Sequence, residues 1–249
     1  MSGSWLVSWH PSPVGLPMLL CLPQAGSGCG QFRQWQKLLG PGVSVVGVQL
    51  PGRESRWSEP LPSTVDVAVA EIVDELAGPL SSGAPYTVFG HSLGGLLGYE
   101  IVRRVPRPPT ALVVAASRPP HLCGSAAGSL GEDRGEESLQ RMLDARGFGA
   151  DDLDEDSREL MLELLRQDAK FSSTYEDPNW ATVDCPVETW GGALDETVTA
   201  EHLEGWRAYA SGPFRRREFP GGHDFWADRP DLMAPALLDL IARPLKEVP

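Results

Sequence analysis

Residues 86–99 read YTVFGHSLGGLLGY and constrain the fold more than any other stretch of the chain. A short β-prone run ends at Phe89, and a helix-compatible segment begins at Gly95. The turn between them has the pattern G-x-S-x-G, centred on Ser92. A strand that becomes a helix within one residue strains that residue and leaves no room for bulk two positions away. We therefore expect Ser92 to stand above the sheet with its hydroxyl exposed.

The pattern by itself is a modest signal. Glycine makes up 27 of the 249 residues, and the bare motif arises by chance roughly once in several such chains. The flanking strand and helix are the context of the nucleophile elbow of the α/β-hydrolases. In that motif Ser92 attacks the substrate, and the backbone N–H of Leu93 points toward the attacked group. The alternative is a glycine-rich turn with an ordinary surface serine.

Apolar runs alternate with helix-like segments along most of the chain, which predicts an α/β fold. Buried strands separated by helices describe a mostly parallel central sheet with helices on both faces. The last strand contains three consecutive arginines, which suits an edge. We expect strands at residues 5–7, 18–22, 43–50, 85–89, 111–116, 186–190 and 214–219, and helices at 65–80, 95–104, 199–209 and 231–242. No stretch resembles a domain boundary, so the prediction is a single α/β-hydrolase domain over residues 1–249.

Residues 118–184 interrupt this alternation, because they contain no strand pattern. An insertion of roughly 60 residues is too long for an ordinary connection, so we expect a helical lid over the site. One helix of this lid follows the acidic run at residues 151–156 and places four apolar residues on one face, Leu160, Met161, Leu164 and Leu165. The apolar residues of the lid either line an acyl channel or belong to the core, as for Met161, Leu165, Phe171 and Tyr175.

A nucleophilic Ser92 needs a general base, because a serine hydroxyl is almost wholly protonated at neutral pH. Histidine suits this task, since a pKa of about 6.5 leaves much of it neutral. In α/β-hydrolases the chain order is serine, then acid, then histidine. This order excludes two of the five histidines, and two others fall in the expected lid and in a helix. His223 follows the last strand in a Gly-Gly loop, so we predict it as the base; a surface-loop histidine is the alternative.

The acid is expected in the loop after the preceding strand, where Asp195 follows a Gly-Gly pair. Its role is to accept the Nδ1–H of His223 and fix the tautomer. Glu196 is the adjacent rival, and Asp184 precedes the strand and belongs to the wrong end of the sheet. Asp224 directly follows His223 and remains a minor competitor.

An oxyanion hole needs a second backbone donor besides Leu93. In this fold the donor comes from the loop after the first main strand, here Gln24 or Ala25. Removing one such donor costs about 10²–10³ in rate.

The composition limits the partners and the compartment. A net charge of −13 and a pI of about 4.8 argue against non-specific binding to nucleic acid or to anionic membranes. The apolar run at residues 18–22 is too short to span a bilayer, and residues 1–17 contain no basic n-region. The cysteines form no C-x-x-C pair, which disfavours a metal site or a disulfide framework. We expect a cytoplasmic protein that contains no metal.

Taken together, these motifs resemble the type II (external) thioesterases that accompany polyketide synthases and nonribosomal peptide synthetases. The resemblance spans nearly the whole chain through six segments in order: CLPQAGSG, VVGVQLPGRESR, FGHSLGGLLGYE, AASRPPH, GGALDETV and PGGHDFW. It implies that Ala25 is the second oxyanion donor. It also implies hydrolysis of acyl thioesters on the phosphopantetheine arm of acyl or peptidyl carrier proteins, without a cofactor. Two residues depart from the family pattern. Gln24 stands where the family often has an aromatic residue, and Asp224 stands where it usually has Phe. The carboxylate of Asp224 could compete with Asp195 for His223.

Two other functions stay open. A hydrolase of the same fold could act on small free esters or acyl-CoA, and a non-catalytic binding module could keep the fold. A carrier-specific enzyme should show a basic surface near the lid despite its net charge of −13. Arg53, Arg56 and Arg118 are candidates for that surface, although ordinary solvated arginines fit the sequence equally well.

Overall fold

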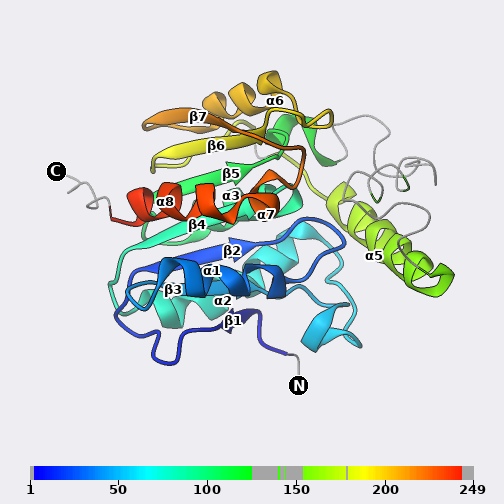
Figure 1. Ribbon diagram of the computed structural model, residues 1–249, viewed down its shortest axis with the longest axis horizontal. Helices are drawn as coiled ribbons and strands as arrows, with labels where there is room; N and C mark the ends of the chain where they lie inside the picture. The colour runs from blue at the N-terminus through cyan, green and yellow to red at the C-terminus, as the bar shows by residue number, and fades with distance from the viewer. Residues whose placement is uncertain (1–2, 125–139, 141–142, 144–153, 178, 243–249) are drawn as a thin grey trace.

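The structure of the protein is a computed structural model. It describes residues 3–124, 140, 143, 154–177 and 179–242. Their centre is a seven-stranded sheet in the order β1-β3-β2-β4-β5-β6-β7 (Figure 1). The strands are β1 (Leu6–Ser8), β2 (Met18–Leu22), β3 (Ser44–Val48), β4 (Tyr86–His91), β5 (Ala111–Ala115), β6 (Val187–Gly192) and β7 (Phe214–Phe219).

Among the strands of the described residues, only the edge strand β1 runs antiparallel to its neighbour, β3; the other pairs are parallel. The chain moves from β2 outward to β3 and then returns to β4 on the other side of β2. The carboxyl ends of β2 and β4 therefore form a topological switch point, where open α/β sheets place their ligands. The loop after β2 and the turn at Ser92 both lie at this point.

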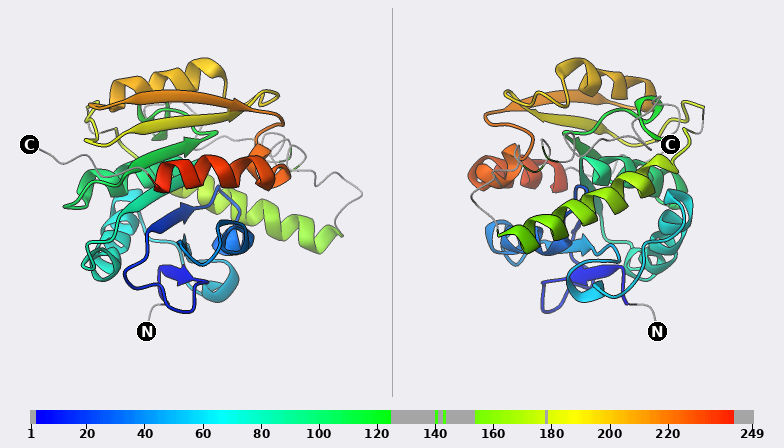
Figure 2. Two further views of the ribbon diagram at one scale, coloured as in Figure 1. Left: turned by 60° about the vertical axis from the view of Figure 1, so that its left-hand side comes forward. Right: turned by 90° about the vertical axis from the view of Figure 1, so that its right-hand side faces the viewer.

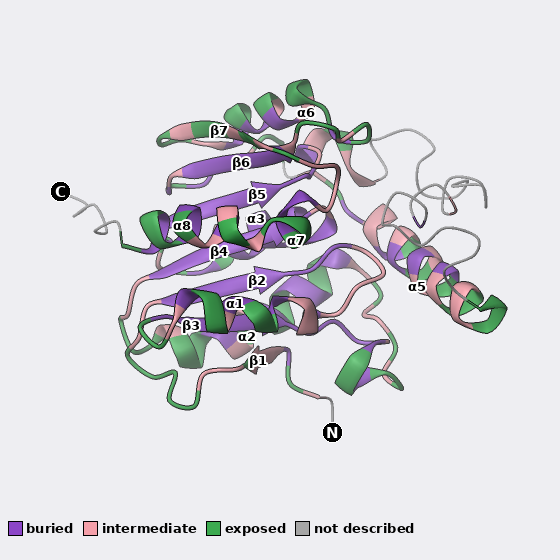
Figure 3. Ribbon diagram, viewed as in Figure 1, coloured by how far each residue is buried: buried purple, intermediate pink, exposed green. Residues whose placement is uncertain are grey.

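Helices cover both faces of the sheet (Figure 2). Alternate residues of β2 enter two separate cores, Leu20 and Leu22 on one face and Leu19 and Cys21 on the other, because strand side chains alternate. The first core is completed by α2 (Val65–Leu80) and α3 (Leu93–Arg104), and the second by α1 (Arg33–Leu39) and α8 (Pro230–Ile241). Strands β2 to β5 are buried throughout, whereas β7 is partly exposed as the second edge (Figure 3).

The expected α/β class and mostly parallel sheet are confirmed. The helix over residues 65–80 and the strands over 18–22 and 214–219 have the predicted bounds. The other expected elements are present with bounds that differ by one or two residues, and two of these differences change the interpretation. Strand β4 runs on to His91 and α3 starts at Leu93, because Ser92 alone makes the turn. The helix expected over 199–209 is α6 (Ala200–Gly205) followed by a 3-10 helix (Trp206–Tyr209).

The segment expected to form a lid contains a short 3-10 helix (Pro120–Leu122) and the long helix α5 (Glu155–Ser173). Much of the rest, residues 125–139, 141–142, 144–153 and 178, lies outside the described residues. Figure 1 shows α5 beyond the carboxyl ends of the parallel strands, on the side of the switch point. The face predicted for α5 is partly wrong, because Leu160 is exposed, and Leu162, Leu165, Asp168 and Phe171 are the buried residues. That the segment acts as a lid stays a prediction.

In the described part of the chain, no helix combines the length and the apolar character needed to cross a bilayer.

Candidate active site

Ser92 occupies the single-residue turn between β4 and α3. Its φ of 52° and ψ of −115° lie in a region that non-glycine residues rarely adopt. The turn is held from both sides, because the N–H of Ser92 donates to the carbonyl of Ala115 at 2.8 Å and its own carbonyl accepts from Gly95 at 2.9 Å. Strain of this kind persists only where the surroundings impose it, and it concentrates at functional sites.

The two glycines of the elbow are required by close backbone contacts. A Cβ added at Gly90 would lie 2.1 Å from the carbonyl oxygen of Gly94. A Cβ added at Gly94 would lie 2.2 Å from the carbonyl oxygen of Leu22 and 2.7 Å from that of Pro23. All three distances are far below van der Waals contact. The elbow therefore presses directly against the loop after β2, the loop in which Ala25 was predicted as an oxyanion donor.

His223 and Asp195 come together at the carboxyl ends of β6 and β7. The Nδ1 of His223 lies 2.8 Å from the Oδ2 of Asp195. The other oxygen of Asp195, Oδ1, accepts from the backbone N–H of Thr197 at 2.8 Å and of Val198 at 3.1 Å. The Asp195 side chain is 1% exposed, so this carboxylate is buried, hydrogen-bonded and fixed in orientation.

Thr197 is a member of this cluster that the sequence analysis missed. Its Oγ1 donates to the Oδ1 of Asp195 at 2.7 Å and lies 3.1 Å from the Nδ1 of His223. An Asp followed two residues later by Thr is typical of an Asx turn, which was the available signal.

These contacts set the charge state of Asp195. Burial raises the pKa of Asp195, but the hydrogen bonds from His223 and Thr197 and the attraction of the imidazole outweigh it and lower that pKa to about 2. The carboxylate is therefore ionised throughout the neutral range. An ionised acceptor at Nδ1 stabilises an imidazolium and holds the ring in one tautomer.

His91, the residue before Ser92, links the elbow to the loop of His223. The two imidazole rings are 4.9 Å apart, and the Nε2 of His91 lies 3.0 Å from the backbone carbonyl oxygen of His223. Asp224 directs its carboxylate toward His91, at 3.8 Å, and toward the amide of Gln24, at 3.4 Å. The two residues that depart from the family pattern, Gln24 and Asp224, therefore contact one another. Asp195 is the carboxylate at the Nδ1 of His223.

The predicted oxyanion donors belong to two segments, the start of α3 and the loop after β2. Leu93 is the first residue of α3, and Ala25 is half-buried in the loop after β2. The next residue in that loop, Gly26, donates its N–H to Asp168 of α5 at 2.5 Å. Asp168 was not among the predicted site residues, although it lies three positions after Leu165 on the apolar side of its helix.

The prediction of a basic surface near the lid is wrong for two of the three arginines. Arg53 is 2% exposed and pairs with Asp168, and Arg56 is 3% exposed and pairs with Glu59. Arg118 is half-buried and donates to the carbonyl of Thr197 at 3.3 Å. Of the rival acids, Glu196 is exposed, and Asp184 accepts from the hydroxyl of Ser211.

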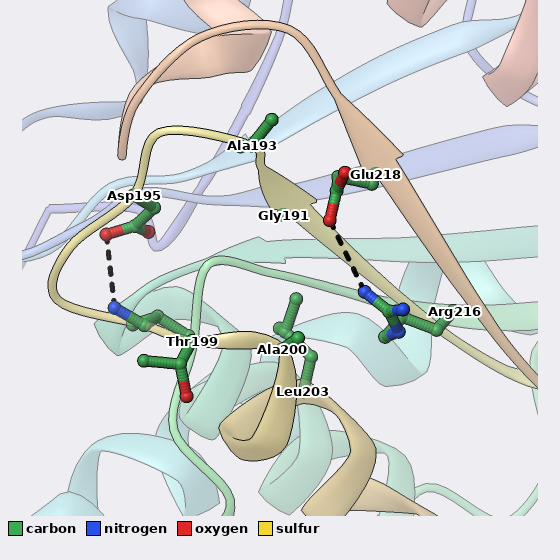
Figure 4. Close-up of a pocket in the computed structure, with 10 residues that line it drawn as sticks. Gly191, Ala193, Asp195, Thr199, Ala200, Leu203, Arg216 and Glu218 are labelled. Carbon is green, nitrogen blue, oxygen red and sulfur yellow. Dashed lines mark hydrogen bonds and ion pairs between the residues drawn. The ribbon is translucent and has the colours of Figure 1, made fainter.

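A small hollow of about 200 Å³ lies beside the acid loop, between the ends of β6 and β7 and the start of α6 (Figure 4). Asp195 and Thr199 border it at one side, and Arg216 and Glu218 of β7 at the other. Ser92 and His223 are not among its lining residues. Four lid side chains were expected either to line an acyl channel or to belong to the core. Two of them, Phe171 and Tyr175, pack in the core that α2 and α3 complete.

A mostly parallel sheet, a serine in a strained strand-to-helix turn and a His–Asp pair at the same edge define the α/β-hydrolase class. A sequence model of the thioesterase domain family matches residues 17–242. The chain therefore belongs to the thioesterase family, and it is an enzyme of the hydrolase class.

Named relatives agree with this assignment. The chain is 32% identical over 243 residues to the thioesterase PikA5 of Streptomyces venezuelae, covering 92% of this chain and 82% of that protein. It is 30% identical over 227 residues to the gramicidin S biosynthesis protein GrsT of Aneurinibacillus migulanus, covering 89% and 87%. The solved structure of RedJ, a thioesterase of the prodiginine pathway in Streptomyces coelicolor, is 33% identical with a TM-score of 0.80, covering 93% of each chain. The resemblance to type II thioesterases of polyketide and nonribosomal peptide systems is confirmed.

Proposed function

We propose that the protein is a cytoplasmic thioesterase that hydrolyses acyl thioesters from the phosphopantetheine arm of carrier proteins, clearing stalled or wrongly primed units. The catalytic part rests on the position of Ser92 in its strained elbow. The preceding residue, His91, packs its imidazole against that of His223. The carrier-protein part is supported by relatives named for gramicidin S biosynthesis and for the prodiginine biosynthetic pathway.

In this proposal the Oγ of Ser92 attacks the thioester carbon while the Nε2 of His223 accepts its proton. The negative charge that forms on the carbonyl oxygen is stabilised by the N–H groups of Leu93 and Ala25. The C–S bond then breaks, and His223 returns the proton to the leaving sulfur. A water molecule, deprotonated by His223, then attacks the acyl-serine; the ester C–O bond breaks, His223 returns the proton to the Oγ of Ser92, and the acid is released. Asp195 keeps the Nδ1–H of His223 pointing away from Ser92 throughout.

A second candidate is an esterase or acyl-CoA thioesterase that acts on small free substrates. The burial of Arg53 and Arg56 favours it, because two of the three cations expected to dock an acidic carrier protein have buried partners instead.

The two candidates differ in the value of kcat/KM for matched substrates. Intact-mass detection of unloading across a panel of acyl-carrier proteins, compared with the same acyl groups on free pantetheine, measures that difference. A carrier-specific enzyme should prefer the protein-bound acyl group by at least about tenfold, a differential binding of about 1.4 kcal/mol. Equal values would favour the second candidate.

The nucleophile is tested by Ser92→Ala, with Ser81→Ala at the end of α2 as the matched control. We expect the first variant to lose hydrolysis by several orders of magnitude and the second to retain it. Undiminished hydrolysis by Ser92→Ala would remove the proposed mechanism.

A further inference from the structure

Asp168, in the second half of α5, is fully buried and joins three segments that are distant in the sequence. Its Oδ2 accepts from the N–H of Gly26 at 2.5 Å and from the Nη1 of Arg53 at 2.6 Å. Its Oδ1 accepts from the Nη2 of Arg53 at 2.7 Å. Arg53 also donates to the carbonyls of Pro51 and Ser27, at 3.1 and 3.5 Å. The ion pair thus connects α5 to the loops after β2 and β3.

Such a pair is a poor net stabiliser, because the desolvation of two charges offsets most of their attraction. What a bidentate arginine–carboxylate pair adds is fixed geometry, since two parallel N–H···O bonds orient both partners. Here one of the same carboxylate oxygens also binds Gly26. The orientation imposed by Arg53 on Asp168 is therefore passed to the backbone of the loop after β2.

Ala25 lies within the turn that this contact holds. The N–H of Ser27 donates to the carbonyl of Gln24 at 3.2 Å and closes the turn. Gly26 has a φ of 74°, as the third residue of a type II turn requires. Asp168 fixes the peptide that follows Ala25, and the cluster of Leu162 and Leu165 packs against the Ala25 side chain. Helix α5 therefore contacts the turn through both its polar and its apolar side.

We propose that Asp168, oriented by Arg53, is a positioning residue that holds the N–H of Ala25 in place for the oxyanion. The inference rests on the proposed function, in which that N–H stabilises the developing charge. Loss of Asp168 leaves Ser92, Asp195 and His223 unchanged, so ground-state binding should change little. Transition-state stabilisation should fall, because a displacement of about 1 Å in such a group can cost about 10²-fold in rate.

The test uses two variants of the full chain and acetyl-pantetheine as substrate. Asp168→Asn is nearly isosteric, but it removes the charge and puts a donor NH2 in place of one of the two acceptor oxygens while Arg53 stays buried, so it should lower both Tm and kcat. The double variant Arg53→Leu with Asp168→Val replaces the pair by apolar side chains of similar total size, which often restores stability. The valine offers no acceptor to the N–H of Gly26. The matched control is Arg56→Met with Glu59→Leu, a neighbouring pair whose other hydrogen bonds in the described structure go to the carbonyl of Gln49 and the N–H of Gly3.

We expect kcat to fall about 10- to 100-fold in both Asp168 variants, with KM within about threefold, while Tm recovers in the double variant. The Ki of a trifluoromethyl ketone, whose serine adduct places an oxyanion in the hole, should rise by a similar factor. The control pair should keep kcat within about twofold. A kcat that recovers together with Tm would overturn the inference and leave a merely structural pair. If Ser92→Ala stays active in the same assay, the proposed function fails instead.

Discussion

Replacing Gly94 by alanine should push the loop after β2, which carries the proposed oxyanion donor Ala25, away from the nucleophile elbow. Gly94 is the second residue of α3, and the added methyl group would lie 2.2 Å from the carbonyl oxygen of Leu22 and 2.7 Å from that of Pro23. Both obstacles are backbone atoms, so no side-chain rotation can relieve the overlap. Strand β2 is held by β3 and β4 on both sides. The movement must therefore fall on the loop that begins at Pro23 and carries Ala25.

The size of the effect follows from that overlap. A carbon and an oxygen pack at about 3.4 Å, so the two backbones must separate by about 1 Å to accommodate the methyl group. An error of about 1 Å in a catalytic group costs about 10²-fold in rate. Overpacking of a rigid interior costs about 1–3 kcal/mol, which for a chain of this size lowers Tm by roughly 2–12 °C. We expect Gly94→Ala to lose about 10²-fold in kcat and to melt earlier.

The assay measures kcat with acetyl-pantetheine and Tm by calorimetry, and Gly98→Ala in the same helix is the matched control. A Cβ at Gly98 would meet side-chain atoms only, at 3.2 Å from Val88 and 3.5 Å from Leu112. Alanine also gains about 1 kcal/mol of helix propensity over glycine, which offsets the slight crowding. Gly98→Ala should therefore retain kcat within about twofold. Wild-type kcat and Tm in Gly94→Ala would refute the reasoning.

Three further outcomes are expected. The pKa of Asp195 is about 2 in the folded protein, against 3.8 for a free side chain. Ionisation of Asp195 therefore contributes roughly 2 kcal/mol to the free energy of unfolding above about pH 4. This contribution is lost as the pH falls toward 2. The Tm deficit of Asp195→Asn relative to wild type should shrink over that interval, and a constant deficit would contradict this. Tyr175→Phe removes a 3.1 Å hydrogen bond to the buried Glu100, which should cost about 1.5–3 kcal/mol by urea unfolding; an unchanged midpoint would argue against it. Burial raises the pKa of Cys29 and of Cys185 to about 12, so neither thiol should react with Ellman's reagent at about pH 8 until the chain is unfolded; rapid labelling of either in the native protein would count against this burial.

The elbow and the His–Asp pair could be predicted from the sequence because the strand topology determines where these residues lie. In a parallel sheet every strand ends at the same edge, so residues that directly follow different strands meet. Asp195 and His223 each follow a strand by a few residues, and the Oδ2 of Asp195 lies 2.8 Å from the Nδ1 of His223. The alternation of buried strands and helices was enough to place them. Thr197 was missed because it completes the cluster through a local turn, not through the strand order.

The charged contacts around the loops could not be predicted in the same way. The segment PGRESR looks like a polar surface loop, yet Arg53 and Arg56 are both buried. The carboxylate that pairs with Arg53 lies 115 residues further along the chain. Sequence patterning shows that a residue is charged, but its burial depends on a partner whose position only the tertiary structure gives. Asp168 gave a hint, because a carboxylate on the apolar side of a helix requires a buried partner.

The loop of Ala25 is held by two kinds of contact, and they should respond differently to substitution. Gly94 supports it through backbone against backbone, where any added atom disturbs the fold and the site together. Asp168 supports it through side chains, where charge can be exchanged for apolar volume without loss of stability. A variant at Gly94 should therefore lose kcat and Tm in parallel, whereas the Arg53–Asp168 replacement should separate them. If both behaved alike, α5 would be no more than a part of the core, and the orientation of Ala25 would depend on the elbow alone.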